Sequence, residues 1–458
     1  MQPKKLLDRR QKRSQSHCGG LPVTQAITEE QCRVYEELVQ KRSVLLLGAA
    51  GTGKSEFIRH VCKNMAGKVA VAAPTAMAAM NLAVGAVTIH SLFQIPPSAT
   101  GYFDADLFAL KSRAAEVLKS INYLVVDEIS MVRPDLFDLM ENLARRARGS
   151  DNFFGGLCLL LVGDFHQLPP VIRSDEFELF RRHYGHSNAF LFDAKSLRDA
   201  PLQAFALTKI FRQKSSHFVK ILGAVSGGKL CGRMLTEING RALNGNAPPK
   251  ESLIITPYRA AAERKNEEEL DALPGIIHEY VGRRVGTFRS IADDELPSPE
   301  RLLLKEGATV VFTCNGAGWV NGSMGTVRRL GKNGVEVLLR GRKKAIPVGS
   351  HSWTHVLPNG GECVETGSYG QIPLRLGYAM TVHRTQGKTC DSIVIQRDRR
   401  FFAHGQLYVA LSRARSLDSI HLSEKISSSD AMADGRVLAY CENLRLGGVA
   451  GKPFVHNQ

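Results

Sequence analysis

Residues 48–55 read GAAGTGKS, and this stretch decides how the surrounding chain is expected to fold. The letters follow the pattern of a phosphate-binding loop, in which four residues separate a glycine from Gly-Lys-Ser. Residues 43–47 before the loop are mostly apolar and predict a buried strand, and residues 54–65 after it predict a helix. Because a strand, a glycine-rich turn and a helix follow one another, we expect a nucleotide site and not a chance glycine-rich turn.

The residue types in this loop suit separate tasks around a phosphate group. Glycines let backbone N–H groups close on the phosphates, and the helix N-terminus adds a favourable partial charge. Lys54 is expected to reach the β- and γ-phosphates, and the hydroxyl of Ser55 is expected to hold Mg²⁺. The predicted nucleotide-binding loop consists of Gly48, Ala49, Ala50, Gly51, Thr52, Gly53, Lys54 and Ser55.

The composition is that of a globular protein with a strong positive charge. The 458 residues are 43% hydrophobic and 23% charged, which allows a sizeable core and suggests about two to four domains. The formal net charge of +16 favours a polyanionic partner, because each Lys or Arg set on a phosphate releases counterions. A basic surface that serves only solubility is the alternative. No apolar run reaches about 18 residues, so we expect no membrane span.

The cysteines and the N-terminal residues bear on the location of the protein. Nine cysteines are scattered without a C-x-x-C pair, which predicts reduced thiols in an intracellular protein, without zinc or disulfides. Residues 1–25 carry KKLLDRRQKR and predict a disordered basic tail without a secretory signal. A nuclear address, an organelle presequence and a plain solvated tail all fit it. Nucleus, mitochondrion and bacterial cytoplasm therefore stay open, with the nucleus favoured.

The remaining pattern predicts an α/β fold with two parallel-sheet domains. Apolar strand candidates alternate with helices, including one over residues 134–148, and such alternation gives a parallel sheet covered on both faces. The first domain is predicted over residues 26–205, with strands at 43–47, 68–73, 121–126 and 157–162. The second is predicted over residues 206–305 and 374–424, with strands at 253–256, 392–395 and 419–422.

A segment with a different sequence pattern separates the two parts of the second domain. Residues 306–373 contain short alternating runs such as GTVRRL and GVEVLLR, which predict a small antiparallel β-barrel inserted in that domain. Residues 425–458 are left as a C-terminal extension. The predicted architecture is thus two motor-like parallel sheets, one inserted barrel and two terminal segments.

Acidic and amide side chains follow two of the predicted strands. In parallel sheets, ligands bind at the carboxyl ends of strands, so Asp127 is expected at Mg²⁺ and Glu128 beside the attacking water. A solvated acidic turn is the alternative. The strand at 157–162 runs into GDFHQLPP, where Gln167 is expected to sense the γ-phosphate; a turn ended by proline is the alternative.

Two arginines complete the predicted catalytic set. Arg212 lies in the sequence FRQ at the start of the second domain, and Arg413 ends the sequence YVALSR on a predicted helix. A guanidinium at the γ-phosphate stabilises the transition state and is typically worth about 10³–10⁵ in rate. Each arginine alone is more often a surface ion pair, but the two in this arrangement favour the catalytic role. If both come from the second domain, ATP lies between two domains, and hydrolysis opens and closes a cleft.

Taken in order, these motifs resemble a known group of enzymes. The set GAAGTGKS, APTAMAAMNL, TIHSLF, VVDEIS, GDFHQLPP, FRQ, VHRTQGKT and YVALSRA is similar to superfamily-1 DNA helicases, over residues 27–422. Residues 134–170, with LKEGATVVFTCN and WVNGSMGTV, resemble more closely the Pif branch (petite integration frequency), which is related to RecD. The resemblance implies two RecA-like motor domains, with a short wedge inserted in the first at about residues 93–110.

The resemblance also implies an activity. It implies an ATP-dependent helicase that moves 5′-to-3′ on single-stranded DNA and unwinds duplexes, with ATP and Mg²⁺ as cofactors. The implied partners are single-stranded DNA and junctions of single with double strands, bound by a protein that is monomeric in solution. Roles in replication, repair, recombination and telomere maintenance follow from the same likeness.

Particular residues receive their roles only from this resemblance. It assigns Gln31 to the adenine base and Gly387 to the triphosphate, beside the residues already named. It assigns Thr75, His90 and His383 to the DNA side of the cleft. Within the wedge, an aromatic such as Tyr102 or Phe103 is expected to stack on the last base pair, and a loop folded over the sheet edge is the alternative. The group more often has an aromatic at the position of His166.

Two other functions remain open at this point. One is a RecD-like motor subunit of a nuclease complex, although the sequence has no cluster of nuclease carboxylates. The other is an ATP-switched clamp on single-stranded DNA that does not unwind, although a switch needs fewer catalytic groups than this chain carries. Unwinding of tailed duplexes and stimulation of ATP turnover by single strands distinguish the three.

Overall fold

The computed structural model describes residues 27–445, except 83, 96–101, 199, 250–251, 294–295, 320, 360–361 and 398–399. The predicted basic tail at residues 1–25 lies outside the described residues, as do the wedge tip at 96–101 and the last part of the C-terminal extension. Within the described part, none of the helices combines the length and apolar character that crossing a membrane requires.

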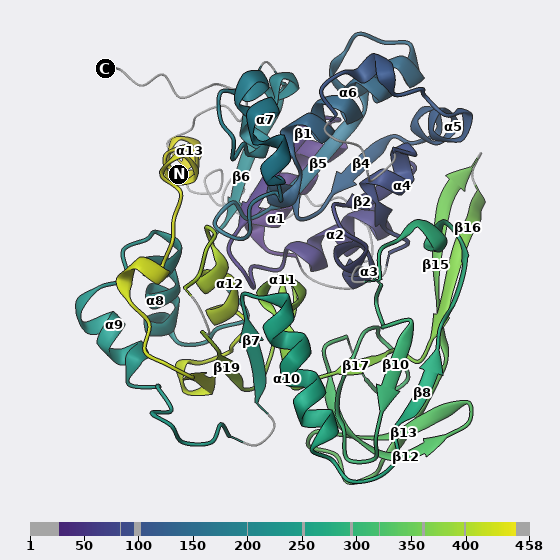
Figure 1. Ribbon diagram of the computed structural model, residues 1–458. Helices are drawn as coiled ribbons and strands as arrows, with labels where there is room; N and C mark the ends of the chain where they lie inside the picture. Colours follow the sequence, from purple (N-terminus) through teal and green to yellow (C-terminus); the bar gives the residue numbers. More distant parts are fainter. Residues whose placement is uncertain are drawn as a thin grey trace, which may run out of the picture.

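The first parallel sheet carries the glycine-rich loop (Figure 1). All its pairings are parallel, and its strand order is β3-β2-β4-β5-β1-β6. The sequence predicted four of these strands but missed the two at its edges, which are short or half exposed. The strands are β1 (Ser43–Gly48), β2 (Val69–Ala73), β3 (Val87–Thr88), β4 (Tyr123–Val126), β5 (Cys158–Gly163) and β6 (Leu202–Leu207).

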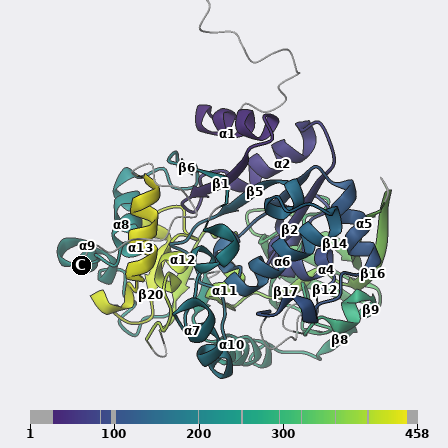
Figure 2. The ribbon, with the colours of Figure 1, turned by 90° about the horizontal axis from the view of Figure 1, so that it is seen from above.

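Helices cover both faces of this sheet. Successive residues of β1 point to opposite faces: Val44 and Leu46 are buried with α1 and α2, and Leu45 is buried with α5 and α6. Figure 2 shows α1 and α2 on one side of β1 and α6 on the other. We call this sheet and its helices the first lobe. Its helices are α1 (Glu29–Val39), α2 (Lys54–Asn64), α3 (Ala76–Leu82), α4 (Ile89–Phe93), α5 (Ser112–Ser120), α6 (Pro134–Arg148) and α7 (Phe177–Tyr184).

A second parallel sheet forms the core of the second lobe. Its order is β18-β7-β19-β20, and the sequence predicted all of these strands except β18. The strands are β7 (Leu253–Thr256), β18 (Ala379–Thr381), β19 (Ile393–Ile395) and β20 (Ile420–Leu422). The helices are α8 (Ser216–Ser226), α9 (Gly232–Asn239), α10 (Arg259–Asp271), α11 (Val382–Thr385) and α12 (Gln406–Leu411), and Figure 1 shows α11 and α12 between the lobes.

The C-terminal extension returns to the first lobe. Its helix α13 (Gly435–Arg445) follows the second lobe in sequence, yet Val437 and Tyr440 belong to the buried core of the first lobe. The ring of Tyr440 stacks on Phe192, with 4.5 Å between the ring centroids. Helix α13 therefore connects the second lobe with the core of the first, which its position in the sequence did not indicate.

The predicted barrel is an open antiparallel sheet. Five strands follow the order β14-β13-β12-β11-β17, and in the described pairing β14 and β17 are edges, so closure into a barrel is not seen. A long hairpin leaves this sheet and pairs with β9, a strand outside the predicted bounds. The strands are β11 (Thr309–Phe312), β12 (Met324–Gly331), β13 (Gly334–Leu339), β14 (Ile346–Gly349), β17 (Leu374–Leu376), the hairpin β15 (His351–Asn359) and β16 (Glu362–Gln371), then β9 (Arg283–Gly286), and the pair β8 (His278–Val281) and β10 (Arg301–Leu304).

Candidate nucleotide-binding site between the two lobes

A cavity of about 910 Å³ lies where the two lobes meet. Residues of the glycine-rich loop line it from one side, and residues after α11 and α12 line it from the other. The fold thus brings together most residues that the sequence predicted for a nucleotide. The predicted residues that line the cavity are Gln31, Ala50, Gly51, Thr52, Gly53, Lys54, Ser55, Asp127, Glu128, Gln167, Arg212, Gly387 and Arg413, whereas Gly48, Ala49, Thr75, His90 and His383 are not part of its lining.

The loop has the close backbone approach that its glycines predicted. Gly51 and Gly53 both have a φ of 86°, which L side chains rarely adopt, and α2 begins directly after Gly53. A Cβ atom on Gly51 would lie 2.5 Å from the Cβ of Arg212. The Nζ of Lys54 donates to the carbonyl oxygens of Gly48 at 2.6 Å and Ala49 at 3.1 Å. The lysine is therefore folded over its own loop, with its charge beside the helix N-terminus.

Two carboxylates follow β4 at the cavity wall. Burial and the neighbouring charge of Glu128 raise the pKa of Asp127 to about 7. Glu128 has left-handed backbone angles, with φ 49° and ψ 43°, and its side chain points toward Gln386 of the second lobe. Its Oε2 accepts a hydrogen bond of 3.0 Å from the Nε2 of Gln386 in the second lobe. The sequence did not predict this contact, because the two residues are 258 positions apart.

Gln167 lies after β5, and only the nitrogen of its side-chain amide is hydrogen-bonded among the described residues. Its Nε2 donates to Asp164 at 3.1 Å, and its Oε1 is buried with no hydrogen-bond partner in the described part of the chain. The same Asp164 accepts from the hydroxyl of Tyr408 at 3.2 Å, and that hydroxyl accepts from the backbone N–H of Ala50 at 3.1 Å. Tyr408 comes from α12, so it ties the second lobe to the loop. A buried acceptor without a donor fits a ligand or water in the cavity.

The two arginines lie together on the far side of the loop. Arg212 is held against the loop, since the neighbouring Phe211 donates its N–H to Gly51 at 2.8 Å. Its guanidinium donates across to the carbonyls of Ser412 at 3.1 Å and Gly387 at 3.4 Å. The segment of Arg212 therefore contacts both lobes, and its predicted place at the start of the second domain stays a prediction.

Arg413 is the second cation and is fully buried. Its guanidinium donates to the backbone carbonyls of Val409 at 2.9 Å and Thr385 at 3.1 Å, all within the second lobe. Burial and the nearby Arg212 lower the pKa of Arg413 to about 9. Within the described residues, neither arginine forms an ion pair with a carboxylate. Two such cations facing a phosphate loop fit a bound polyanion, because unpaired buried charge is costly.

Gln31 is positioned by the helix that it begins. Thr28 caps α1, and the Oε1 of Gln31 accepts from the Thr28 N–H at 3.0 Å in a capping box. Its Nε2 points to the loop and donates to the carbonyl of Gly53 at 3.4 Å. The ring of Phe211 lies beside Gly53 as well, and this residue is about half exposed at 52%. An amide and an exposed ring around Gly53 can hold a planar base.

Comparisons with known proteins identify the family of this chain. A profile of the PIF1-like helicases matches residues 26–230. The Pif1 helicase of Bdellovibrio bacteriovorus is 30% identical and shares 88% of this chain and 89% of its own length. The chain belongs to the PIF1-like helicase family. Human PIF1 is 32% identical over 93% of this chain, but the chain spans only 65% of the human protein.

Solved structures of this family have the same fold. A Bacteroides Pif1 in complex with ADP-AlF4 is 30% identical and superposes with a TM-score of 0.81 over 93% of this chain and 98% of that one. The same Bacteroides protein bound to single-stranded DNA superposes with a TM-score of 0.70 over the same shares. The two parallel sheets of this PIF1-like chain are therefore RecA-like, as predicted.

The three residues assigned to the DNA side share one kind of position. Thr75, His90 and His383 come just after the carboxyl ends of β2, β3 and β18. The Oγ1 of Thr75 accepts from the N–H of Ala78 at 3.1 Å. Burial lowers the pKa of His383, and burial together with Arg133 lowers that of His90 to about 4, so both rings are neutral at pH 7. Their positions fit the PIF1-like assignment, which remains a proposal.

The two aromatics expected to stack on a base pair are packed inside the first lobe instead. Tyr102 is 4% exposed, its hydroxyl lies 3.0 Å from the Nε2 of His90, and its ring contacts Phe108 at 5.5 Å. Phe103 stacks on His183 with 4.5 Å between ring centroids. Tyr102 is buried and Phe103 is half-buried, which favours the alternative of a loop folded over the sheet edge, and base stacking by either ring stays a prediction.

Sequence reasoning missed residues that line the cavity and others that hold its wall without lining it, such as Asp164, Tyr408 and Gln386. Asp164 stood in the quoted sequence GDFHQLPP, and an acid directly after a buried strand was the available signal. Tyr408 and Gln386 gave no such signal, since each acts on the other lobe through a contact that only folding creates. The lining residues that the sequence did not predict are Ile27, Thr28, Glu56, Phe57, Arg59, His60, Ala78, Asn81, Lys209, Phe211, Thr389 and Arg415.

Proposed function

We propose that this chain is an ATP-dependent DNA helicase that moves 5′-to-3′ on single-stranded DNA and unwinds duplexes. The observation that carries the proposal is the cavity between two RecA-like lobes, lined on one side by the phosphate loop and acids and on the other by Arg413. Human PIF1 and its relatives are ATP-dependent DNA helicases by name, and the Bacteroides relative has been captured with ADP-AlF4 and with single-stranded DNA.

ATP binding rests on the loop and on the residues around its base. The N–H groups of residues 50–55 and the ammonium of Lys54 would surround the phosphates, and Gln31 would contact the adenine. In the present geometry Lys54 donates to carbonyls of its own loop, so a phosphate would replace those acceptors. Gly387 lines the cavity from the second lobe and would approach the terminal phosphate. The positive charges and helix N-terminus make this exchange favourable.

Hydrolysis rests on groups that are already placed at the wall. Ser55 and Asp127 would hold Mg²⁺, which neutralises phosphate charge in such sites. Glu128 would polarise the attacking water, and the unpartnered Oε1 of Gln167 would accept a hydrogen bond from that water or from the nucleotide's hydration shell. Arg212 and Arg413 would stabilise the charge that develops on the phosphoryl group. Both cations are close to the loop but lack carboxylate partners in the described part of the chain, which suits this task.

Movement follows from the position of the cavity. A change of charge between the lobes alters the bonds that Arg212 and Tyr408 make across them, so ATP turnover would shift one lobe against the other. Thr75, His90 and His383 would contact the single strand, with junctions of single and double strands as further ligands. We propose that the protein acts as a monomer inside the cell, with the nucleus as the favoured compartment.

Tailed duplexes test this function directly. We expect ATP hydrolysis to rise when single-stranded DNA is added, and duplexes with a 5′ tail to separate while duplexes with a 3′ tail do not. Stimulated hydrolysis without separation would indicate the ATP-switched clamp. Activity only together with a nuclease subunit would indicate the RecD-like role, and separation of 3′-tailed duplexes alone would contradict the proposed direction.

A further inference from the structure

Gln386 makes a side-chain hydrogen bond to the carboxylate of Glu128 across the boundary between the lobes. Its Nε2 donates at 3.0 Å, its side chain is 9% exposed, and its Oε1 is buried without a partner in the described residues. A hydrogen bond of this kind occupies one carboxylate oxygen and turns the carboxylate toward its donor. In this arrangement Glu128 is held by the second lobe and away from the task of polarising water.

The segment that carries Gln386 also carries a residue of the proposed DNA side. His383 lies on α11, and Gln386 is the residue that ends this single turn. Thr381 caps the turn, and the Oγ1 of Thr385 donates to the Val382 carbonyl at 2.7 Å, so we expect the segment to shift as one unit. A ligand that shifts His383 must therefore shift the amide that holds Glu128.

We propose that Gln386 is a positioning residue that restrains Glu128 until single-stranded DNA contacts His383. When the amide of Gln386 moves away, the carboxylate of Glu128 can polarise the attacking water. One short segment, α11 with Gln386, thus couples ATP hydrolysis to DNA binding. The inference rests on the proposed function, because it needs ATP hydrolysis and a DNA strand at α11. It adds an intramolecular brake that acts through one hydrogen bond across the cleft.

The test compares hydrolysis with and without DNA. In Gln386→Leu, which keeps the size but not the donor, we expect the DNA-free rate of ATP hydrolysis to rise about tenfold, the effect of losing one hydrogen bond to a charged group. The rate at saturating single-stranded DNA should stay within about twofold, so the stimulation by DNA shrinks. Gln203→Leu, an exposed glutamine on β6, is the matched control and should leave both rates unchanged.

A second variant keeps the result decisive. Gln386→Asn retains the amide but is one methylene shorter, so it loses the reach to Glu128 and should show the same split if Gln386→Leu does not fold. An unchanged or lower DNA-free rate in the folded variant overturns the brake. If the unchanged protein neither hydrolyses ATP nor responds to DNA, the proposed function fails instead, and the two failures are distinguishable.

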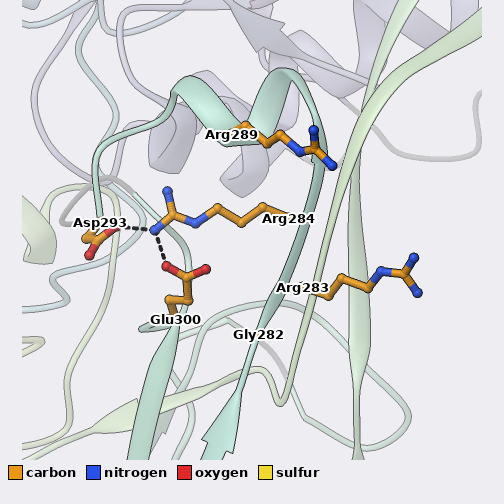
Figure 3. A pocket seen from close by; sticks show the side chains of 6 residues that line it. All are labelled: Gly282, Arg283, Arg284, Arg289, Asp293 and Glu300. Carbon is orange, nitrogen blue, oxygen red and sulfur yellow. Dashed lines mark hydrogen bonds and ion pairs between the residues drawn. The ribbon is translucent and has the colours of Figure 1, made fainter.

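A separate observation concerns three arginines at the base of the hairpin (Figure 3). Arg284 turns into the fold and pairs with Asp293 and with Glu300, the latter at 2.7 Å. Arg283 on β9 and Arg289 on the short helix Thr287–Ser290 are exposed and point to the other side of the strand. Neither guanidinium makes a hydrogen bond or ion pair within the described residues. Two free guanidinium groups therefore lie beside one whose charge is already neutralised.

The backbone under this pair is held rigidly. Phe288, between Thr287 and Arg289, is 1% exposed and stacks on Tyr369 with 5.8 Å between ring centroids. A Cβ on Gly282 would lie 2.6 Å from the hydroxyl of Tyr369, so strand and hairpin are in close contact. Met80 of α3 packs against the same cluster, and α3 begins directly after Thr75 of the proposed DNA side. The two arginines are thus presented on a fixed base next to the proposed DNA path.

We infer that Arg283 and Arg289 form a contact for the phosphate backbone of DNA. Free arginines on a rigid frame suit phosphate oxygens, which they bind with paired N–H donors. The backbone is either that of the tracked single strand or that of the duplex ahead of it. This inference also rests on the proposed function, and it extends the DNA surface from the lobes to β9.

Salt dependence of binding tests this contact. In the double variant Arg283→Gln, Arg289→Gln we expect the slope of log affinity against log salt to fall by about 1.4 for a single strand or about 1.8 for a blunt duplex, as for two lost phosphate contacts. Fluorescence anisotropy with each DNA shows which backbone is bound. The control Arg33→Gln, Arg181→Gln removes the same charge from exposed arginines that are paired with glutamates. Slopes equal to the control for both DNAs overturn the site, whereas no binding by the unchanged protein counts against the proposed function.

Discussion

The two sides of the cavity are built in different ways. On the first-lobe side, Lys54, Asp127 and Gln167 each follow a buried strand of one sheet, so local structure positions them. On the second-lobe side, Arg413 is buried among backbone carbonyls of its own lobe and reaches the loop region only because the lobes are packed together. The difference indicates that binding groups are preorganised by one lobe, whereas groups for hydrolysis depend on how the lobes meet.

Arg413→Lys should have the largest effect on this comparison. Lysine keeps the charge but lacks the planar fork that donates to several carbonyls, so we expect ATP hydrolysis to fall by about 10³–10⁵. Nucleotide affinity should change little, because the first lobe supplies the binding groups. A rate assay with single-stranded DNA, next to titration with a fluorescent ATP analogue, measures both. Parallel loss of affinity and rate would show that the second lobe also binds.

Glu128→Gln should come next. The amide keeps the shape but cannot polarise water, and the loss of a general base costs about 10²–10⁴ in rate. Unwinding should stop, whereas binding of DNA and nucleotide should persist. In Lys54→Ala, unwinding should likewise stop while DNA binding persists. Normal unwinding by either variant would refute the assignment of this cavity as the hydrolysis site.

Tyr408→Phe should have a smaller effect, and it should act on the contact between the two lobes rather than on the rate of hydrolysis. It removes the hydroxyl that links Ala50 with Asp164 and leaves buried polar groups unpaired, so we expect a loss of about 1–3 kcal/mol in the free energy of unfolding. Denaturant unfolding measures this loss. Tyr258→Phe is the control, since its hydroxyl donates to Arg400 at 3.2 Å at the surface, and it should cost less than about 0.5 kcal/mol. Equal costs would mean that the inter-lobe tie adds no stability.

Phe103→Leu should have the smallest effect on function. The ring packs on His183 and Phe180, so we expect about 1 kcal/mol of lost stability and an unwinding rate within about twofold of the unchanged protein. Stopped-flow unwinding of a 5′-tailed duplex measures the rate. A large drop in rate with normal stability would restore the role of this ring at the duplex.

The sequence predictions were more accurate for elements held by local contacts than for pairings between residues far apart in the sequence. The helix at residues 134–148 was predicted with both ends correct, because Pro134 occupies its first turn and Gly149 ends it in a left-handed conformation. β6 was missed because its residues LQAFAL are only partly buried and give no continuous apolar run. The hairpin's pairing with β9 was missed because Gly367 meets Gly286 across many intervening residues.

The chain by itself determined the loop, the strands before each functional acid and the amphipathic helices, since these depend on residues within one or two turns of one another. Tertiary structure decided that Gln386 holds Glu128, that Tyr408 ties Ala50 to Asp164, and that α13 returns to the first lobe. The physical reason is that hydrogen bonds between distant segments depend on how whole sheets pack, and the periodicity of a sequence records only which face of each segment is buried.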